Sequence, residues 1–182
     1  MTTGEVRLRD ATPGDFERWL ALREAVAEEG RYIGTEAPLD RHVNRGIFDR
    51  AIADDNKASF LAVSGDDEIV GALGLELGAG IVHLGMWVSS EHRGQGVGRL
   101  LLQGCIDWAR AHGAHKVALE AWPHNEAAIR LYLGMGFAVE GRLRRQWRRR
   151  DGSLWDAVAM GLVLDEDAPG CPIPDAPSLP SP

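Results

Sequence analysis

The feature that most constrains this fold is a glycine-rich segment at residues 93–99, which reads Arg-Gly-Gln-Gly-Val-Gly-Arg. Residues 81–89 before it are rich in β-forming side chains, and residues 100–110 after it repeat apolar side chains at helical spacing. Glycines at alternate positions leave successive backbone N–H groups open to an anion at the start of a helix. The segment therefore predicts a strand, a phosphate-binding loop and a helix in succession.

Two common phosphate loops do not fit this segment. A dinucleotide-binding G-x-G-x-x-G pattern that began at Gly94 would need glycine at position 99, where the chain has Arg99. The Gly-Lys-Ser/Thr of a P-loop occurs nowhere in the chain. The pattern Arg-x-x-Gly-x-Gly fits instead, and with residues 88–98 it resembles the acyl-CoA pyrophosphate loop of the GNAT N-acetyltransferase superfamily.

A second segment, residues 119–137, is similar to another GNAT motif. It follows the pattern L-E-x-x-x-x-N-x-x-A-I-x-L-Y-x-x-x-G-F. Two independent matches at the family's own spacing, with a compatible order of elements over most of residues 5–164, make the resemblance specific. It implies an enzyme that transfers acetyl from acetyl-CoA to a primary amine, with acetyl-CoA as cosubstrate.

The spacing of the expected elements predicts the sheet. Short breaks separate strands expected at 59–64, 68–78 and 81–89, which indicates antiparallel neighbours. A helix at 98–112 followed by a strand at 116–122 indicates a parallel pair. We therefore expect an α/β, GNAT-like fold with a mixed, mostly antiparallel, twisted sheet, a splayed parallel strand pair and flanking helices. Further strands are expected at 5–9, 138–148 and 154–164, and further helices from residue 16 to about Gly30, at 40–54 and at 127–133.

The composition limits the number of domains and the classes of binding partner that we expect. With 182 residues, 45% of them apolar, the chain suits one acetyltransferase domain at 1–164, followed by a proline-rich tail at 165–182 that we expect to be disordered. The net charge of −7 argues against nucleic acid as a partner, and the lack of a long apolar run argues against a membrane. Cys105 and Cys171 do not suggest a disulfide framework, so a cytoplasmic setting is expected.

The donor site can be assigned by chemistry and by the resemblance together. Backbone N–H groups of the glycine loop can bind the pyrophosphate, and a flanking arginine can add charge. The strand before the loop can pair with the pantetheine amides, and Asn125 can supply an amide or cap its helix. The cofactor-binding residues are then Met86, Trp87, Val88, Arg93, Gly94, Gln95, Gly96, Val97, Gly98, Arg99, Asn125 and Tyr132. No metal is expected, because the histidines are scattered.

Two side chains are candidates for catalysis. A phenol with a pKa near 10 stays protonated at neutral pH, so Tyr132 can donate a proton to the departing thiolate, although packing in the core is the alternative. Glu120 is the candidate base, directly or through water, and its alternatives are an architectural role or orientation of a cationic substrate.

The acceptor site is less constrained. Tyr32, Thr35 and Glu36 are candidate substrate contacts in the loop after the first helix, where an exposed connector would use the same residue types. Trp147 and Trp155 can line the acceptor site or a subunit interface, which leaves a homodimer open.

Three functions remain open from the sequence. The first is direct attack by a small-molecule amine on acetyl-CoA in a ternary complex. The second is acetylation of a protein N-terminus, because the spacing of Glu120 and Tyr132 resembles the base and acid of bacterial ribosomal-protein alanine N-acetyltransferases. The third is an acyl-CoA-binding regulatory module without turnover.

Overall fold

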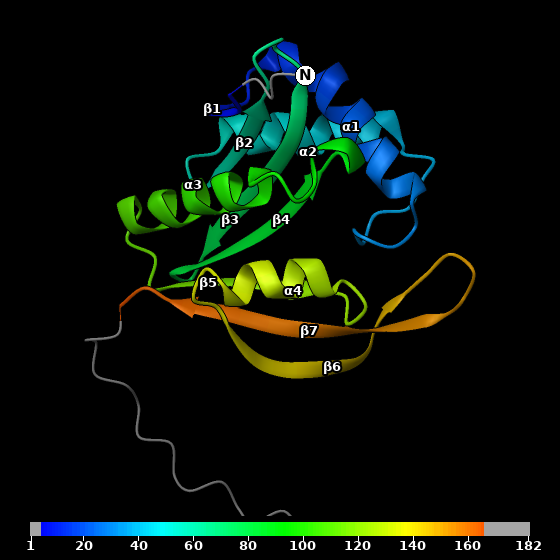
Figure 1. Cartoon of the computed structure of the whole chain (residues 1–182), viewed down its shortest axis with the longest axis vertical. Helices are drawn as coiled ribbons and strands as arrows, with labels where there is room; N and C mark the ends of the chain where they lie inside the picture. The colour runs from blue at the N-terminus through cyan, green and yellow to red at the C-terminus, as the bar shows by residue number, and fades with distance from the viewer. Residues whose placement is uncertain (1–4, 166–182) are drawn as a thin grey trace, which may run out of the picture.

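The computed structural model describes residues 5–165 and contains one seven-stranded sheet in the order β1-β2-β3-β4-β5-β7-β6 (Figure 1). The strands are β1 (Arg7–Asp10), β2 (Lys57–Val63), β3 (Ile69–Gly78), β4 (Ile81–Val88), β5 (Lys116–Ala121), β6 (Ala138–Arg148) and β7 (Leu154–Val163). The helices are α1 (Phe16–Glu28), α2 (Arg41–Ala53), α3 (Val97–Ala111) and α4 (Glu126–Leu133), with short 3-10 turns η1 (Pro13–Asp15) and η2 (Ser90–His92).

The parallel pair of strands is β4 and β5, and it splits the sheet. The two strands pair at three positions, Ile81 with Lys116, Val82 with Val117 and His83 with Ala118, and then diverge. Beyond this point β4 stays paired with β3, and β5 stays paired with β7. The predicted α/β fold with a splayed parallel pair in a mostly antiparallel sheet is therefore confirmed.

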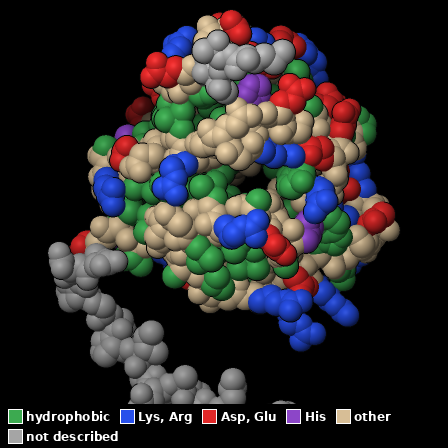
Figure 2. Space-filling view, viewed as in Figure 1, with side chains coloured by type: hydrophobic (Ala, Val, Ile, Leu, Met, Phe, Trp, Pro, Cys, Tyr) green, Lys and Arg blue, Asp and Glu red, His purple; other side chains and the backbone are tan. Residues whose placement is uncertain are grey.

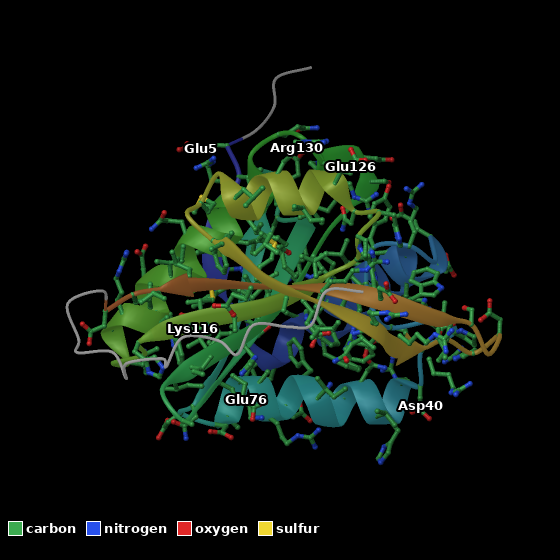
Figure 3. All side chains as sticks on the ribbon, turned by 90° about the horizontal axis from the view of Figure 1, so that it is seen from below. Glu5, Asp40, Glu76, Lys116, Glu126 and Arg130 are labelled. Atoms are coloured by element: carbon green, nitrogen blue, oxygen red, sulfur yellow. The ribbon has the colours of Figure 1, made fainter. Side chains whose placement is uncertain are left out.

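Helices cover both faces of the sheet because its central strands are apolar on both faces. In β2, Leu61 and Val63 pack with Phe16, Trp19 and Phe48 of α1 and α2. The alternate residues Phe60 and Ala62 pack on the other face with Leu101, Leu102 and Cys105 of α3. Figure 3 shows α4, which carries Glu126 and Arg130, and α2, which follows Asp40, on opposite sides of the sheet.

The predicted boundaries differ from the observed ones by one or two residues at most ends. The strand expected at 5–9 lies at Arg7–Asp10, and the strand expected at 59–64 lies at Lys57–Val63. Cys105 is buried in the core, and burial raises the pKa of its thiol to about 12. The predicted tail, apart from its first residue, and Cys171 lie outside the described residues. Within residues 5–165, none of the helices has the length and apolar character needed to cross a bilayer.

Candidate active site

The divergence of β4 and β5 opens two adjoining cavities. One has a volume of about 370 Å³ and lies toward β5 and the hairpin of β6 and β7, and the other has about 420 Å³ and lies toward the glycine loop. Figure 2 shows a hollow near the middle of this face, between the regions that Figure 1 labels β4 and α4. The linings of the two cavities share Tyr32, Ile33, Met86, Trp87, Asn125, Ala128 and Tyr132. We call the first the acceptor cavity and the second the loop cavity.

The glycine loop presents open backbone to the loop cavity. Gly94 and Gly96 have φ angles of 72° and 88°, and a Cβ at either position would meet no atom within 4 Å. The first backbone hydrogen bond of α3 runs from Leu100 N–H to the Gly96 carbonyl over 3.0 Å. The backbone N–H groups of residues 94–99 make no hydrogen bond to any acceptor of the described residues. The loop therefore offers a set of free donors at a helix N-terminus, which suits a phosphate.

The two arginines beside the loop differ in their partners. Arg93 donates to the Val88 carbonyl over 3.1 Å and to the Glu29 carboxylate over 2.7 Å, and this carboxylate raises the pKa of Arg93. Arg99 contacts the Met135 sulfur at 3.1 Å and has no carboxylate within ion-pair distance in the part of the chain that the structure describes. Of the two arginines, Arg99 is therefore the one whose charge no carboxylate of residues 5–165 neutralises.

The remaining residues expected at the donor site fall into two groups. Val88 and Gly98 line the loop cavity. Pairing of β4 with β5 ends at His83, so the residues of β4 after His83 have no strand partner on the edge that faces β5. The side chains of Gln95 and Val97 do not line the cavity: Gln95 donates to the Glu91 carbonyl over 2.7 Å, and Val97 is buried.

Tyr132 and Asn125 line both cavities from one side of α4. Tyr132 is 7% exposed, its ring centroid lies 5.8 Å from that of Phe137, and burial raises the pKa of its phenol to about 12. Asn125 is the N-cap of α4 and accepts a hydrogen bond from Ala128 N–H over 3.3 Å. The phenol is thus a protonated group at the junction of the two cavities.

Glu120 lines the acceptor cavity and is held by two donors from β6. Its carboxylate accepts from the Trp147 indole N–H over 2.7 Å and from the Gln146 amide over 3.2 Å. Adjacent residues of a regular strand point to opposite faces, so two consecutive side chains would not normally reach one partner. An irregularity in the pairing between Leu143 and Trp147, with Arg145 at a φ of 53°, explains the arrangement.

The loop between α1 and α2 forms part of the acceptor cavity. Tyr32 and Thr35 line it, whereas Glu36 lies outside both linings. Glu36 accepts from the Arg150 backbone N–H over 3.0 Å and pairs with Arg149 at 3.6 Å. The structure therefore brings two of the three expected acceptor residues to the cavity and directs the third to the hairpin of β6 and β7.

Sequence reasoning did not assign Arg23 to the site, although it lines the acceptor cavity. It donates to Asn44 Oδ1 over 2.8 Å and to Thr35 Oγ1 over 2.9 Å. Its position in the sequence could have indicated this role. Arg23 lies in the apolar stripe of α1, four residues after Trp19, three after Leu20 and three before Val26, all of which are buried. Within residues 5–165 no cluster of three or more His, Cys, Asp or Glu side chains could hold a metal ion.

Comparisons with known proteins agree with this geometry. Residues 19–137 match the sequence model of the Acetyltransferase (GNAT) family. An L-methionine sulfoximine/L-methionine sulfone acetyltransferase from Pseudomonas paraeruginosa is 29% identical over 164 residues, which cover 87% of this chain and 94% of the relative. An L-amino acid N-acyltransferase from Escherichia coli is 35% identical over 81 residues, which cover 44% and 46% of the two chains. The structure of yncA from Salmonella typhimurium with its cofactor acetyl-CoA superposes with a TM-score of 0.77 at 22% identity, over 92% of this chain and 99% of that one.

Proposed function

This chain belongs to the GNAT acetyltransferase family and is an acetyl-CoA-dependent N-acetyltransferase, and we propose that its acceptor is the primary amine of a small molecule. The amine attacks the donor directly while both substrates are bound. The observation that carries this proposal is the pair of adjoining cavities that meet at Tyr132 and Asn125. One cavity ends at free backbone donors and the other at a carboxylate.

The loop cavity fits the donor. The N–H groups of residues 94–99 lack protein acceptors, and the open space at Gly94 and Gly96 lets a phosphate approach the backbone. Arg99 adds a charge that no protein carboxylate neutralises within the described chain. Arg93 supports the same site by joining the loop to Glu29 of the α1–α2 connection.

Proton transfer is assigned to two side chains of the acceptor cavity. When bound, acetyl-CoA supplies a thioester whose carbonyl carbon gains a bond to the amine nitrogen as its bond to sulfur breaks. Glu120, oriented by Trp147 and Gln146, accepts the proton that the amine must lose, directly or through one water. Tyr132 holds its proton at neutral pH and donates it to the thiolate.

Direct attack is favoured because neither cavity is lined by a serine or cysteine of residues 5–165 that could carry the acetyl group. Cys105 is fully buried in the core, and burial raises the pKa of its thiol to about 12, so it is an inert group. A ternary complex is therefore the simplest route for the acetyl group.

Hydrogen bonds between the α1–α2 loop and the hairpin of β6 and β7, beside the acceptor cavity, favour a small acceptor over a protein N-terminus. Arg149 donates to the Gly34 carbonyl over 2.9 Å, and Arg150 donates to the Ala37 carbonyl over 2.6 Å. These bonds tie the α1–α2 loop to the hairpin of β6 and β7, and they restrict the room for an extended peptide. The amino acid derivatives in the name of the Pseudomonas relative support the same size of acceptor.

The test is thiol release from acetyl-CoA across polyamines, amino acids, aminoglycosides and short N-terminal peptides, beside calorimetric titration with acetyl-CoA. Release with a small amine, and none with the peptides, is expected. Release with peptides alone would favour the protein N-terminal function instead. Binding of acetyl-CoA without release from any acceptor would favour a regulatory module.

A further inference from the structure

Arg23 occupies an unusual place for an arginine. It projects from the apolar stripe of α1, and its guanidinium carbon lies 5.2 Å from the ring centroid of Trp19 and 5.2 Å from that of Trp87. Thr35 and Asn44 hold it from the α1–α2 loop and from α2. The guanidinium is therefore fixed in position at the wall of the acceptor cavity.

No protein carboxylate neutralises Arg23 within residues 5–165. Both of its hydrogen-bond partners are neutral oxygens, and burial lowers its pKa. Two acidic residues, one in α1 and one in the α1–α2 loop, are used elsewhere: Glu24 accepts from Leu39 N–H over 3.2 Å, and Glu36 binds the hairpin. A partly buried cation without a counter-ion is retained at a cost in stability, which a bound anion would offset.

The buried donors without partners gather at the same place. Within the described residues, the buried side-chain polar atoms that make no hydrogen bond are Trp19 Nε1, Arg23 Nε and Trp87 Nε1. Indole and guanidinium groups only donate, so the missing partner must be an acceptor. Arg23 and Trp87 both line the acceptor cavity, and the charge of Arg23 makes an anionic acceptor the better complement.

The acceptor cavity therefore holds one positive and one negative side chain. Glu120 is the carboxylate in its lining, and Arg23 is the guanidinium without a carboxylate partner. A zwitterion with an ammonium and a carboxylate complements both charges. An amine without a carboxylate complements Glu120 alone and leaves the charge of Arg23 without a counter-ion.

We propose that the acceptor is a free amino acid whose carboxylate binds Arg23, with its amine directed to Glu120 at the junction of the cavities. This inference rests on the proposed function, because it names the acceptor of the same site. Arg23 is then a specificity-determining residue that selects amino acids over derivatives that lack the free carboxylate. The rings of Trp19 and Trp87 both lie against its guanidinium.

The experiment compares matched acceptors in thiol-release kinetics. L-methionine sulfone, L-methionine and L-leucine are each assayed beside the corresponding primary amide, which keeps the side chain and the amine and removes the negative charge of the carboxylate. The wild-type protein should favour the acid of at least one pair by about tenfold or more in kcat/KM. The ionised carboxylate makes the amine of the amino acid more basic than the amine of the amide, so less of it is unprotonated at neutral pH. A preference for the amino acid therefore cannot arise from a larger fraction of unprotonated amine.

Arg23→Gln should lower kcat/KM for the preferred acid by about 100-fold, mainly through KM, and should change kcat/KM for the amide by less than about threefold. Arg23→Lys should retain an intermediate preference, because it keeps the charge and loses the planar fork. Arg45→Gln is the matched control: Arg45 also lies over an aromatic ring, 4.7 Å from the Phe16 centroid, but it is paired with Asp49 and lines neither cavity.

The outcomes separate this inference from the proposed function. Equal use of acids and amides by the wild-type protein, as expected if water alone satisfies the buried donors, would overturn the role of Arg23 and leave the small-amine function intact. Acetylation of peptides alone would overturn both. If Arg23→Gln does not fold, the wild-type acid-to-amide ratio and the Arg23→Lys variant decide the matter.

Discussion

Trp147 on β6 donates its indole N–H to Glu120 on β5 across 2.7 Å. This bond links the carboxylate assigned as the base to a hairpin strand that is not its neighbour in the sheet. Trp147→Phe removes the donor and keeps an aromatic ring beside Trp122. We expect kcat to fall about tenfold because the carboxylate is less well oriented, with the Kd of acetyl-CoA unchanged by calorimetry.

Trp155→Phe is the control for this change, because Trp155 lies in the same hairpin but does not bind Glu120 or line either cavity. It should alter kcat by less than about threefold, because it keeps an aromatic ring beside Trp122 and leaves the bond to Glu120 in place. Equal losses in the two variants would mean that hairpin packing, and not the bond to Glu120, matters.

Tyr132→Phe removes the proposed acid and keeps the ring that packs against Phe137. We expect kcat to fall by about 10²–10⁴-fold, the usual contribution of general acid catalysis, while acetyl-CoA still binds. Burial raises the phenol's pKa to about 12, above its ordinary value of about 10, so the acid stays protonated from neutral pH to mildly alkaline pH. Unchanged turnover would show that another group protonates the thiolate.

Gly96→Leu tests the phosphate loop. Gly96 has a φ of 88° and faces open space in the loop cavity, so a leucine there strains the backbone and fills the path of the donor. The Kd of acetyl-CoA should rise by about 100-fold or more, because phosphate contacts supply much of the binding energy.

Gly113→Leu is the matched control for backbone strain. Gly113 has a φ of 69°, faces open space and follows the other end of α3, away from both cavities. Both variants should lose about 1–2 kcal/mol of stability, but only Gly96→Leu should lose affinity for acetyl-CoA. Similar affinities in the two variants would remove the loop from the donor site.

Asp15→Asn tests an ion pair that anchors α1. Asp15 is 1% exposed and accepts from Arg9 over 2.7 Å, from Arg18 over 2.8 Å and from Thr12 N–H over 2.8 Å. The hydrogen bonds from Arg9 foremost, and from Thr12, hold the pKa of Asp15 well below the usual range. A depressed pKa in the folded state contributes stability that is present above the unfolded value near 3.9 and is lost as pH falls below it. The substitution should therefore cost about 2–3 kcal/mol at pH 7 and less at pH 3 in urea unfolding.

Asp67→Asn is the control for Asp15, because Asp67 pairs with Arg18 and Arg7 while its side chain is 59% exposed. It should change stability by less than about 1 kcal/mol. A cost for Asp15→Asn that does not vary between pH 7 and pH 3 would contradict the assignment of the stability to the charged carboxylate.

Much of the fold follows from local patterns, because turn residues and apolar periodicity act over a few positions. The short breaks between β2, β3 and β4 allow only antiparallel neighbours, and the helix between β4 and β5 is long enough for the crossover that a parallel pair needs. The glycine loop and Tyr132 were visible for the same reason, since each belongs to a contiguous motif.

The acceptor site could not be predicted in this way, because it is assembled from distant segments. The bond from Gln146 and Trp147 to Glu120 depends on an irregularity in β6 that alternation does not predict. Glu36 turns to Arg149 and Arg150, which follow it by more than 100 residues in the chain. The sequence places Arg23 in an apolar stripe of α1. That its hydrogen-bond partners are neutral oxygens and not carboxylates is evident only from the structure.

The most direct test of the account is a two-substrate initial-rate study, in which thiol release is followed while acetyl-CoA and the preferred small amine are both varied. Direct attack in a ternary complex predicts double-reciprocal lines that converge, and it predicts no thiol release when the acceptor is left out. Parallel lines, or a burst of thiol in the absence of acceptor, would show a covalent acetyl-enzyme and would contradict the account.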